Sequence, residues 1–213
     1  MIVDEQPIRF TWGPIINLVE FPHLLLTFQQ RVPSRPNKPT TAEIERRASD
    51  LVKSNFANKD DLRDFIRTVC NWGGYPGIAG RILKGSRIER IAATFQKAYR
   101  QAQGGNVVEA LKTLQQTKSL RGVSFASKHL KFLAPEKAVV LDSILSGRLG
   151  YRMDVDGYAR FLNDCNTILH HILAEEVKYT GWATSGWRVS DVEMAIFAKV
   201  KFGLKPPSPF RAA

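Results

Sequence analysis

Apolar residues recur every three or four positions along most of the chain, which is the spacing that places them on one face of an α-helix. Helix-starting patterns stand at the head of six such runs: residues 40–43, Asp60, residues 86–89, Asn106, Asp154 or Asp156, and residues 190–193. Glycines and a proline in NWGGYPG, residues 71–77, end the second run. Since no series of strands and no internal repeat competes with these runs, the sequence predicts an all-α fold.

The first forty residues are less regular than the rest. Residues 8–12, IRFTW, alternate like a short strand, and the apolar stretch after them predicts a broken helix packed against the main body. That stretch is interrupted by Glu20, Pro22 and His23, so it is too broken to span a bilayer. Residues 31–40, RVPSRPNKPT, contain three prolines and no apolar periodicity, and we expect an extended connection there.

Positive charge is concentrated in the middle of the chain. The formal net charge is +11, and the segment from Arg81 to Lys137 holds twelve Lys or Arg residues and three acids, hence nine of those net charges. Such a concentration is typical of a surface that follows the phosphates of a nucleic acid. A solvated basic surface that serves only solubility is the alternative.

Cysteine usage indicates a reducing compartment. The only two cysteines, Cys70 and Cys165, both lie inside apolar helical patterns, so we expect two buried free thiols rather than a disulfide. They are too few to build a zinc or iron–sulfur site. The N-terminus lacks the pattern of a signal peptide. We therefore expect a cytoplasmic protein without a metal or a cofactor.

A predicted helix, tight turn and helix occupy residues 114–133. The first helix ends before a turn at Gly122, and Ser124 is expected to cap the second. Such a hairpin presents backbone N–H groups and a helix N-terminus, which favour phosphate oxygens of any base sequence. Gly122 and Ser124 are therefore predicted to contact DNA phosphates, and Lys118, Arg121 and Lys131 would add charge for the same ligand. An ordinary turn between two helices is the alternative.

Three segments carry a resemblance to a known family: LRGVSFASK at residues 120–128 with Asp142 after it, NWGGYPGIAGRIL at residues 71–83, and WRVSDVEMAIF at residues 187–197. Together they resemble the helix-hairpin-helix DNA glycosylases of the 8-oxoguanine glycosylase kind, in particular archaeal-type and bacterial members that include antiphage enzymes. The hairpin departs from the family's usual Leu-Pro-Gly-Val-Gly, because Arg121 stands in place of the proline and Ser124 in place of the second glycine.

The resemblance implies a fold and a pair of reacting residues. Two helical lobes would enclose a DNA-binding cleft, one made of residues 1–58 with 151–213 and the other, with the hairpin, of residues 59–150. Lys128 matches the family's nucleophile and Asp142 its catalytic aspartate. Lys128 would attack C1′ of a flipped nucleotide while Asp142 stabilises the positive charge; alternatively, Asp142 activates water. Asp142 is equally suited to cap a helix.

The partner implied is double-stranded DNA that contains a modified base, bound by a monomeric prokaryotic protein. An oxidised purine and a hypermodified cytosine of phage DNA both remain open, and with them a role in repair or in antiviral defence. The aromatic candidates for a base pocket or a duplex wedge are Trp72, Tyr75, Phe125 and Trp187, although each could instead be core or rim. Asp191 and Glu193 are interpreted as structural, Glu193 as a capping-box residue.

Two further functions compete with a glycosylase. A non-catalytic helix-hairpin-helix module would keep the hairpin and the basic face without any chemistry. A basic domain that binds proteins or a membrane surface would require an exposed amphipathic helix flanked by lysines. We rank that possibility last, because the apolar faces are needed for the core.

Overall fold

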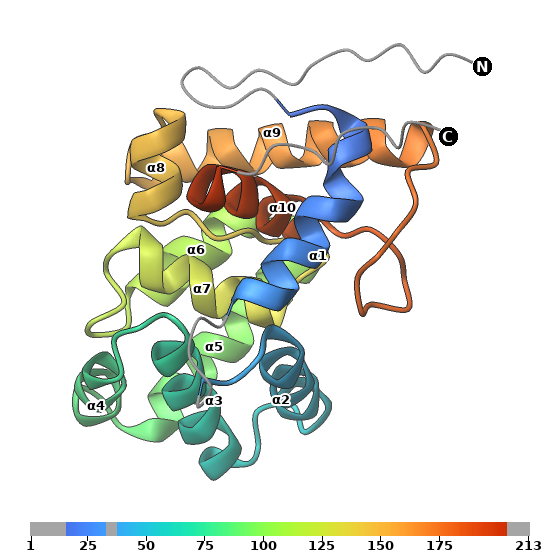
Figure 1. Ribbon diagram of the computed structural model, residues 1–213. Helices are drawn as coiled ribbons and strands as arrows, with labels where there is room; N and C mark the ends of the chain where they lie inside the picture. Colours follow the sequence, from blue (N-terminus) through green and yellow to red (C-terminus); the bar gives the residue numbers. More distant parts are fainter. Residues whose placement is uncertain (1–15, 33–37, 204–213) are drawn as a thin grey trace, which may run out of the picture.

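The computed structural model describes residues 16–32 and 38–203 (Figure 1). Its elements are the 3-10 turn η1 (Leu18–Glu20) and the helices α1 (Phe21–Arg31), α2 (Thr41–Lys53), α3 (Lys59–Trp72), α4 (Gly77–Lys84), α5 (Ile88–Gln103), α6 (Val107–Gln115), α7 (Val123–Leu133), α8 (Ser143–Leu149), α9 (Val155–Ala174) and α10 (Val189–Phe202). No strand occurs among the described residues, so the predicted all-α class is confirmed. The expected strand at residues 8–12 and residues 33–37 of the expected connection lie outside the described part.

Several helices begin at the caps that the sequence predicts. The backbone N–H of Glu43 donates to Thr40 Oγ1 at 3.2 Å and the N–H of Thr40 donates to Glu43 Oε2 at 2.6 Å, which confirms the capping box of α2. Of the two aspartates proposed for α9, it is Asp154 that caps the helix, by accepting the N–H of Gly157 at 2.8 Å. These predictions hold because a cap is a local interaction.

Three helix starts differ from the prediction. Helix α7 begins at Val123 with Gly122 at the cap position, so Ser124 lies inside the first turn and does not cap it. Helix α5 begins at Ile88, with Arg87 rather than a serine at its cap. Helix α10 begins at Val189, and Asp191 in its first turn accepts the N–H of Arg188.

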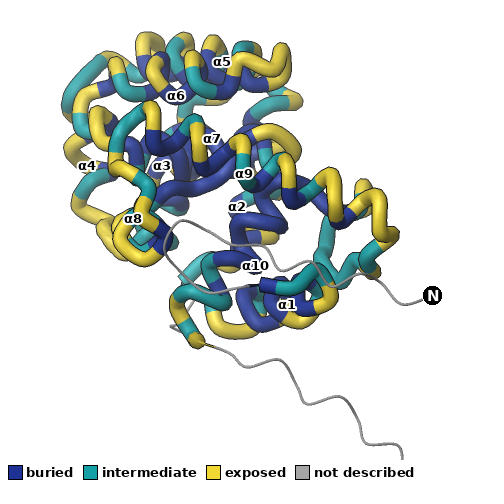
Figure 2. Tube along the Cα trace, turned by 90° about the horizontal axis from the view of Figure 1, so that it is seen from above, coloured by how far each residue is buried: buried dark blue, intermediate teal, exposed yellow. Residues whose placement is uncertain are grey.

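Helices α7 and α10 are the most deeply buried elements of the fold. All but two residues of α7 are buried, as are residues 189–196 of α10, and the buried positions run through the interior of the molecule (Figure 2). A helix buried on all sides lacks a polar face. Any charged residue among the buried positions of α7 and residues 189–196 of α10 must therefore find its partner inside the protein or at a cavity.

The other helices surround these two. Helix α1 lies along α10, where the rings of Phe28 and Phe197 meet edge to face at 5.8 Å and Glu20 pairs with Lys199. Helices α2, α3 and α4 lie at the opposite end of the molecule from α8 and α9, with α5, α6 and α7 between them (Figure 1). The division into two lobes at the predicted boundaries stays a prediction.

Two smaller points follow from the described helices. Both cysteines are buried free thiols, as expected. Within residues 16–32 and 38–203, no helix has the length and apolar character needed to cross a bilayer.

Candidate active site

Lys128 and Asp142, fourteen positions apart in the sequence, lie side by side in the structure. Lys128 Nζ on α7 is 3.8 Å from Asp142 Oδ2 at the start of α8, and the two side chains are 8% and 16% exposed. Lys128 Nζ also donates a hydrogen bond to Ser124 Oγ at 2.9 Å, one helical turn earlier. Ser124, predicted to bind phosphate, is thus half-buried and orients the lysine.

The two oxygens of Asp142 face different partners. Oδ1 accepts the backbone N–H groups of Ile144 at 3.0 Å and Leu145 at 3.1 Å, so Asp142 is the N-cap of α8. Oδ2 is the oxygen that faces Lys128. Both sequence interpretations of Asp142, cap and partner of Lys128, therefore agree with its geometry.

Gly73 makes room for the stem of Lys128. This glycine ends α3, and a Cβ atom added to it would lie 3.3 Å from Lys128 Cδ and 3.4 Å from the carbonyl oxygen of Val69. A Cβ at this position would require the lysine stem to shift by a few tenths of an ångström. The first glycine of the NWGGYPG segment thus lets the stem of Lys128 pack closely against the end of α3.

Lys128 and Asp142 line a cavity of about 160 Å³ between α1, α3, α7 and α10. Its wall combines apolar and charged side chains: Phe28, Val32, Trp72, Val140, Ile144 and Phe197, with Lys38, Lys128, Asp142, Glu193 and Lys201. A small cavity that combines apolar walls with convergent polar groups is typical of a ligand site.

Burial and neighbouring charges act in opposite directions on the cavity's ionisable groups. Burial lowers the pKa of the Lys128 ammonium, while attraction to Asp142 and Glu193 works to raise it. Burial raises the pKa of the Glu193 carboxyl to about 8, a shift that the positive charges of Lys131 and Lys128 reduce and the negative charge of Asp142 increases. Perturbed groups in a cleft are common at functional sites.

The four aromatic candidates fall into three environments. Trp72 lines the cavity and packs edge to face on Phe132 at 5.0 Å. Tyr75 is 64% exposed, and its ring meets that of half-buried Phe125 at 5.7 Å. Trp187 does not belong to a base pocket or a wedge: it is 8% exposed, packs edge to face on its neighbours and donates its Nε1–H to the carbonyl oxygen of Val177 at 2.8 Å.

The predicted DNA contacts on the hairpin also differ in their exposure to solvent. Lys118, Arg121 and Gly122 are exposed. The prediction for Lys131 is wrong, because its side chain is 0% exposed and pairs with Glu45 at 3.4 Å. It lies on a face of α7 that the other helices cover completely, so it cannot reach a phosphate from this position.

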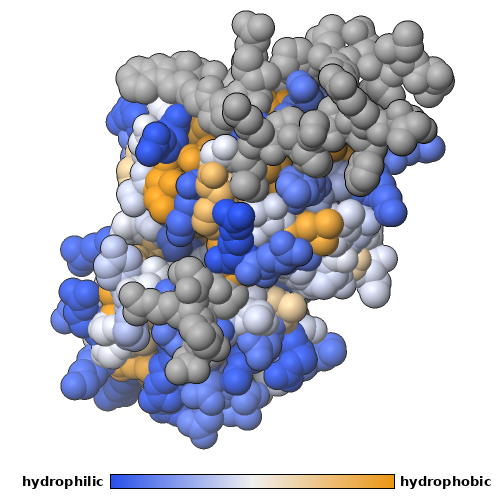
Figure 3. Space-filling view, in the orientation of Figure 1, coloured by the Kyte–Doolittle hydropathy of each residue, from blue (hydrophilic) through white to orange (hydrophobic). Residues whose placement is uncertain are grey.

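Further exposed cations lie next to the hairpin. Arg81 and Lys84 on α4 and Lys118 border an open groove of about 430 Å³ whose wall also includes Gly77, Gly80 and Gly85. None of the three cations has an acidic partner within 4.0 Å among the described residues. Hydrophilic side chains dominate the part of the surface that lies over α2–α4 in Figure 3.

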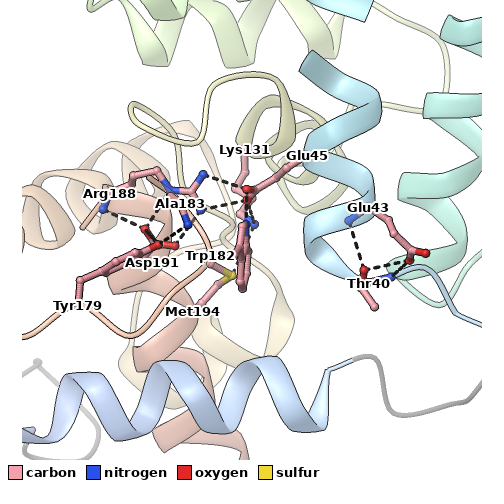
Figure 4. A network of polar contacts seen from close by, with 10 residues as sticks. All are labelled: Thr40, Glu43, Glu45, Lys131, Tyr179, Trp182, Ala183, Arg188, Asp191 and Met194. Atoms are coloured by element: carbon pink, nitrogen blue, oxygen red, sulfur yellow. Dashed lines mark hydrogen bonds and ion pairs between the residues drawn. The ribbon is translucent and has the colours of Figure 1, made fainter. Parts of the chain in front are cut away.

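A buried ionic network holds α2, α7 and α10 together. The carboxylate of Glu45 accepts hydrogen bonds from Arg188 Nη1 at 2.9 Å and Trp182 Nε1 at 2.7 Å, and it also faces Lys131 (Figure 4). Arg188 makes a second, bidentate pair with Asp191, through contacts of 2.9 Å from Nε and Nη2. Burial alone would raise the pKa of Glu45, but the charges of Lys131 and Arg188 hold it below its usual value.

Glu193 is the site residue that the sequence analysis missed. The capping-box interpretation is wrong, because α10 begins earlier: Arg188 is the N-cap, and Asp191, the third helical residue, accepts its backbone N–H. Glu193 is instead 3% exposed and lines the cavity. A signal for its burial was available. Apolar residues stand on every side of it in VSDVEMAIFA, which is typical of a helix without a solvent face.

No family model, curated protein or solved structure is significantly similar to this chain. The case for a function therefore rests on the residues and the geometry described above.

Proposed function

We propose that this protein is a DNA glycosylase that turns a modified nucleotide out of the duplex and breaks the bond between its base and C1′ of the sugar. The observation that carries the proposal is the pairing of Lys128 and Asp142, 3.8 Å apart, in the wall of a small cavity. Both side chains are nearly buried, yet they lie where a small ligand could reach them.

The surroundings of the cavity suit a duplex. The hairpin cations Lys118 and Arg121 are exposed, and Arg81 and Lys84 extend the positive surface along α4. Contacts of this kind bind phosphates without regard to sequence. Tyr75, exposed and supported by Phe125, is placed to fill the gap that a flipped base leaves.

The two proposed reacting groups have complementary roles. Asp142, held by two backbone N–H groups, would stabilise positive charge on the deoxyribose as the base departs. Lys128 is desolvated, which favours loss of its proton and therefore attack on C1′. If Lys128 keeps its proton, Asp142 would activate a water molecule instead, and an intact abasic site would remain.

The size of the cavity bears on the substrate. At about 160 Å³ it is smaller than the ~300 Å³ at which sites for drug-sized ligands begin. This volume favours a base with a small modification, such as an oxidised purine or a hydroxymethylated cytosine, over a glucosylated cytosine.

A non-catalytic DNA-binding module remains the second candidate, and one observation favours it. The two hydrogen bonds that Asp142 Oδ1 accepts are enough to explain an aspartate at the start of α8. In that case Lys128 and Asp142 would form only a structural pair.

The decisive experiment is mass-spectrometric detection of free base. The protein would be incubated with duplexes that contain 8-oxoguanine, an alkylated purine, hydroxymethylcytosine or its glucosylated form, and the Asp142→Asn variant would be treated identically. Release of one base by the wild type and its loss in the variant would support the proposal. Salt-sensitive binding to every duplex without release of any base would favour the non-catalytic module.

A further inference from the structure

Glu193 places a second carboxyl group in the wall of the cavity that holds Lys128 and Asp142. It is 3% exposed and comes from the buried part of α10. None of its contacts with a described lysine, arginine or histidine is as short as 4.0 Å. A buried carboxylate without a close cation is strongly disfavoured relative to the neutral acid.

Pairing around the cavity supports the neutral form of Glu193. Of the buried cations nearby, Lys128 is next to Asp142 at 3.8 Å and Lys131 is next to Glu45 at 3.4 Å. Arg188 is shared by Glu45 and Asp191, each at 2.9 Å. Among the buried groups, four acids therefore face three cations, and Glu193 is the acid without a cation within 4.0 Å, which favours its protonated form.

The groups that face Glu193 come from several elements. Lys128 and Lys131 on α7 favour its charged form, whereas Asp142 disfavours it. Tyr158 and Cys165 on α9 are buried, and burial raises the pKa of both. Lys38 and Lys201 also line the cavity, and Lys201 is exposed. Burial outweighs the nearby positive charges, and the net effect is a raised pKa of Glu193.

We propose that Glu193 donates a proton to the base as it leaves the sugar, an inference that rests on the glycosylase function proposed above. The bond between C1′ and the base nitrogen breaks, its electron pair stays on the base, and the carboxyl proton of Glu193 moves to a nitrogen or oxygen of that base. The positive charge left at C1′ faces the Asp142 carboxylate, and the new bond to C1′ is formed by water, or by Lys128 after its ammonium proton has passed to solvent. The proton that this nucleophile releases restores Glu193.

The two carboxyl groups thus have opposite charge states in one cavity. Asp142 accepts two backbone N–H groups and lies next to Lys128, which favours its ionised form, while the surroundings of Glu193 keep it neutral. A pair of acids whose environments separate their charge states is the usual arrangement for a proton donor working with an electrostatic stabiliser. It would let the base leave as a neutral molecule instead of an anion.

The first measurement tests the charge state and does not depend on activity. Difference infrared spectra between wild type and Glu193→Gln should contain the carbonyl band of a protonated carboxylic acid at pH 7, and this band should disappear as the pH is raised. Glutamine has nearly the same shape, and melting curves would show whether the variant folds. A spectrum with only the carboxylate bands at pH 7 would overturn the proposal.

The second measurement is the single-turnover rate of base release between pH 6 and 10, on the substrate that wild type releases fastest. Wild-type rates should fall along the same titration as the infrared band. Glu193→Gln should be about 10²- to 10⁴-fold slower at pH 7, the usual contribution of general acid catalysis, and should lack this fall. Glu109→Gln is the matched control, because Glu109 is an exposed acid paired with Lys112; it should behave as wild type.

Two outcomes separate this inference from the proposed function. A Glu193→Gln variant that releases base as fast as wild type overturns the role of Glu193 and leaves the glycosylase proposal standing. A wild-type protein that releases no base from any duplex, while its infrared band is present, overturns the glycosylase proposal and the proton transfer with it.

Discussion

Because the two oxygens of Asp142 have different partners, we predict that two substitutions at this residue will distinguish its effect on the stability of α8 from its effect on base release. Oδ1 accepts hydrogen bonds from the backbone N–H groups of Ile144 and Leu145, and Oδ2 faces Lys128. In Asp142→Asn an oxygen remains to cap α8, and asparagine is as good a cap as aspartate, but the charge is lost. In Asp142→Ala both the cap and the charge are lost.

The expected difference between the variants follows from the cap alone. Loss of an N-cap side chain costs about 1 kcal/mol, within a range of roughly 0.5 to 2. For a chain of this size, that free energy corresponds to a melting temperature about 2–4 °C lower for Asp142→Ala than for Asp142→Asn. Base release should fall about equally in both, by roughly 10²- to 10³-fold, because both lack the carboxylate.

Thermal unfolding followed by circular dichroism and single-turnover base release would measure the two effects separately. Asp154 supplies the matched control, since it caps α9 in the same way through the N–H of Gly157 and does not line the cavity. Asp154→Asn and Asp154→Ala should differ from one another in stability by a similar amount and release base normally. Base release by Asp142→Asn at the wild-type rate would refute the reasoning, since Asp142 would then be only a cap.

Two further predictions concern the buried charges. Burial lowers the pKa of His129 to about 4, whereas an unfolded histidine titrates near 6.5. As the pH falls from 6.5 to 4, the unfolded state therefore binds a proton that the folded state does not, and this residue alone should lower the free energy of unfolding by about 3 kcal/mol. Urea unfolding at a series of pH values should show a correspondingly weaker pH dependence of that free energy for His129→Leu. Glu45→Gln should destabilise the fold by about 3 kcal/mol, because it leaves Lys131 and Arg188 buried with less compensating charge. Glu43→Gln, at the exposed capping box of the same helix, should cost much less, because glutamine can fill the same capping-box position; equal losses at both positions would contradict the role of the network.

The sequence predicted those features that depend on neighbours along the chain. The capping box at Thr40 and the caps at Asp142 and Asp154 follow from side chains that bond to backbone groups two or three residues away. The approach of Lys128 to Asp142 was not predictable from such patterns. This pair was predicted only because LRGVSFASK and the aspartate after it resemble a family of enzymes.

The features that the sequence did not predict depend on three-dimensional packing. Lys131 was expected on the surface because lysine usually lies there, but α7 is covered on all sides and Glu45, distant in the chain, lies against this lysine. Trp187 is in the core for the same reason, since α1 packs over it. The cavity could not be inferred either, because α1, α3, α7 and α10 each contribute only part of its wall.

Lys128 and Lys131 show how surroundings distinguish two residues of one type on the same helix. Both are buried, and burial lowers the pKa of each. Lys131 lies among Glu45, Arg188 and the ring of Phe132, in a network outside the wall of the cavity. Lys128, one turn earlier, faces a single carboxylate at 3.8 Å, donates to a neutral hydroxyl and lines the cavity. Loss of a proton therefore breaks a network at Lys131 but only one long ion pair at Lys128, which makes Lys128 the better placed of the two to act as a nucleophile.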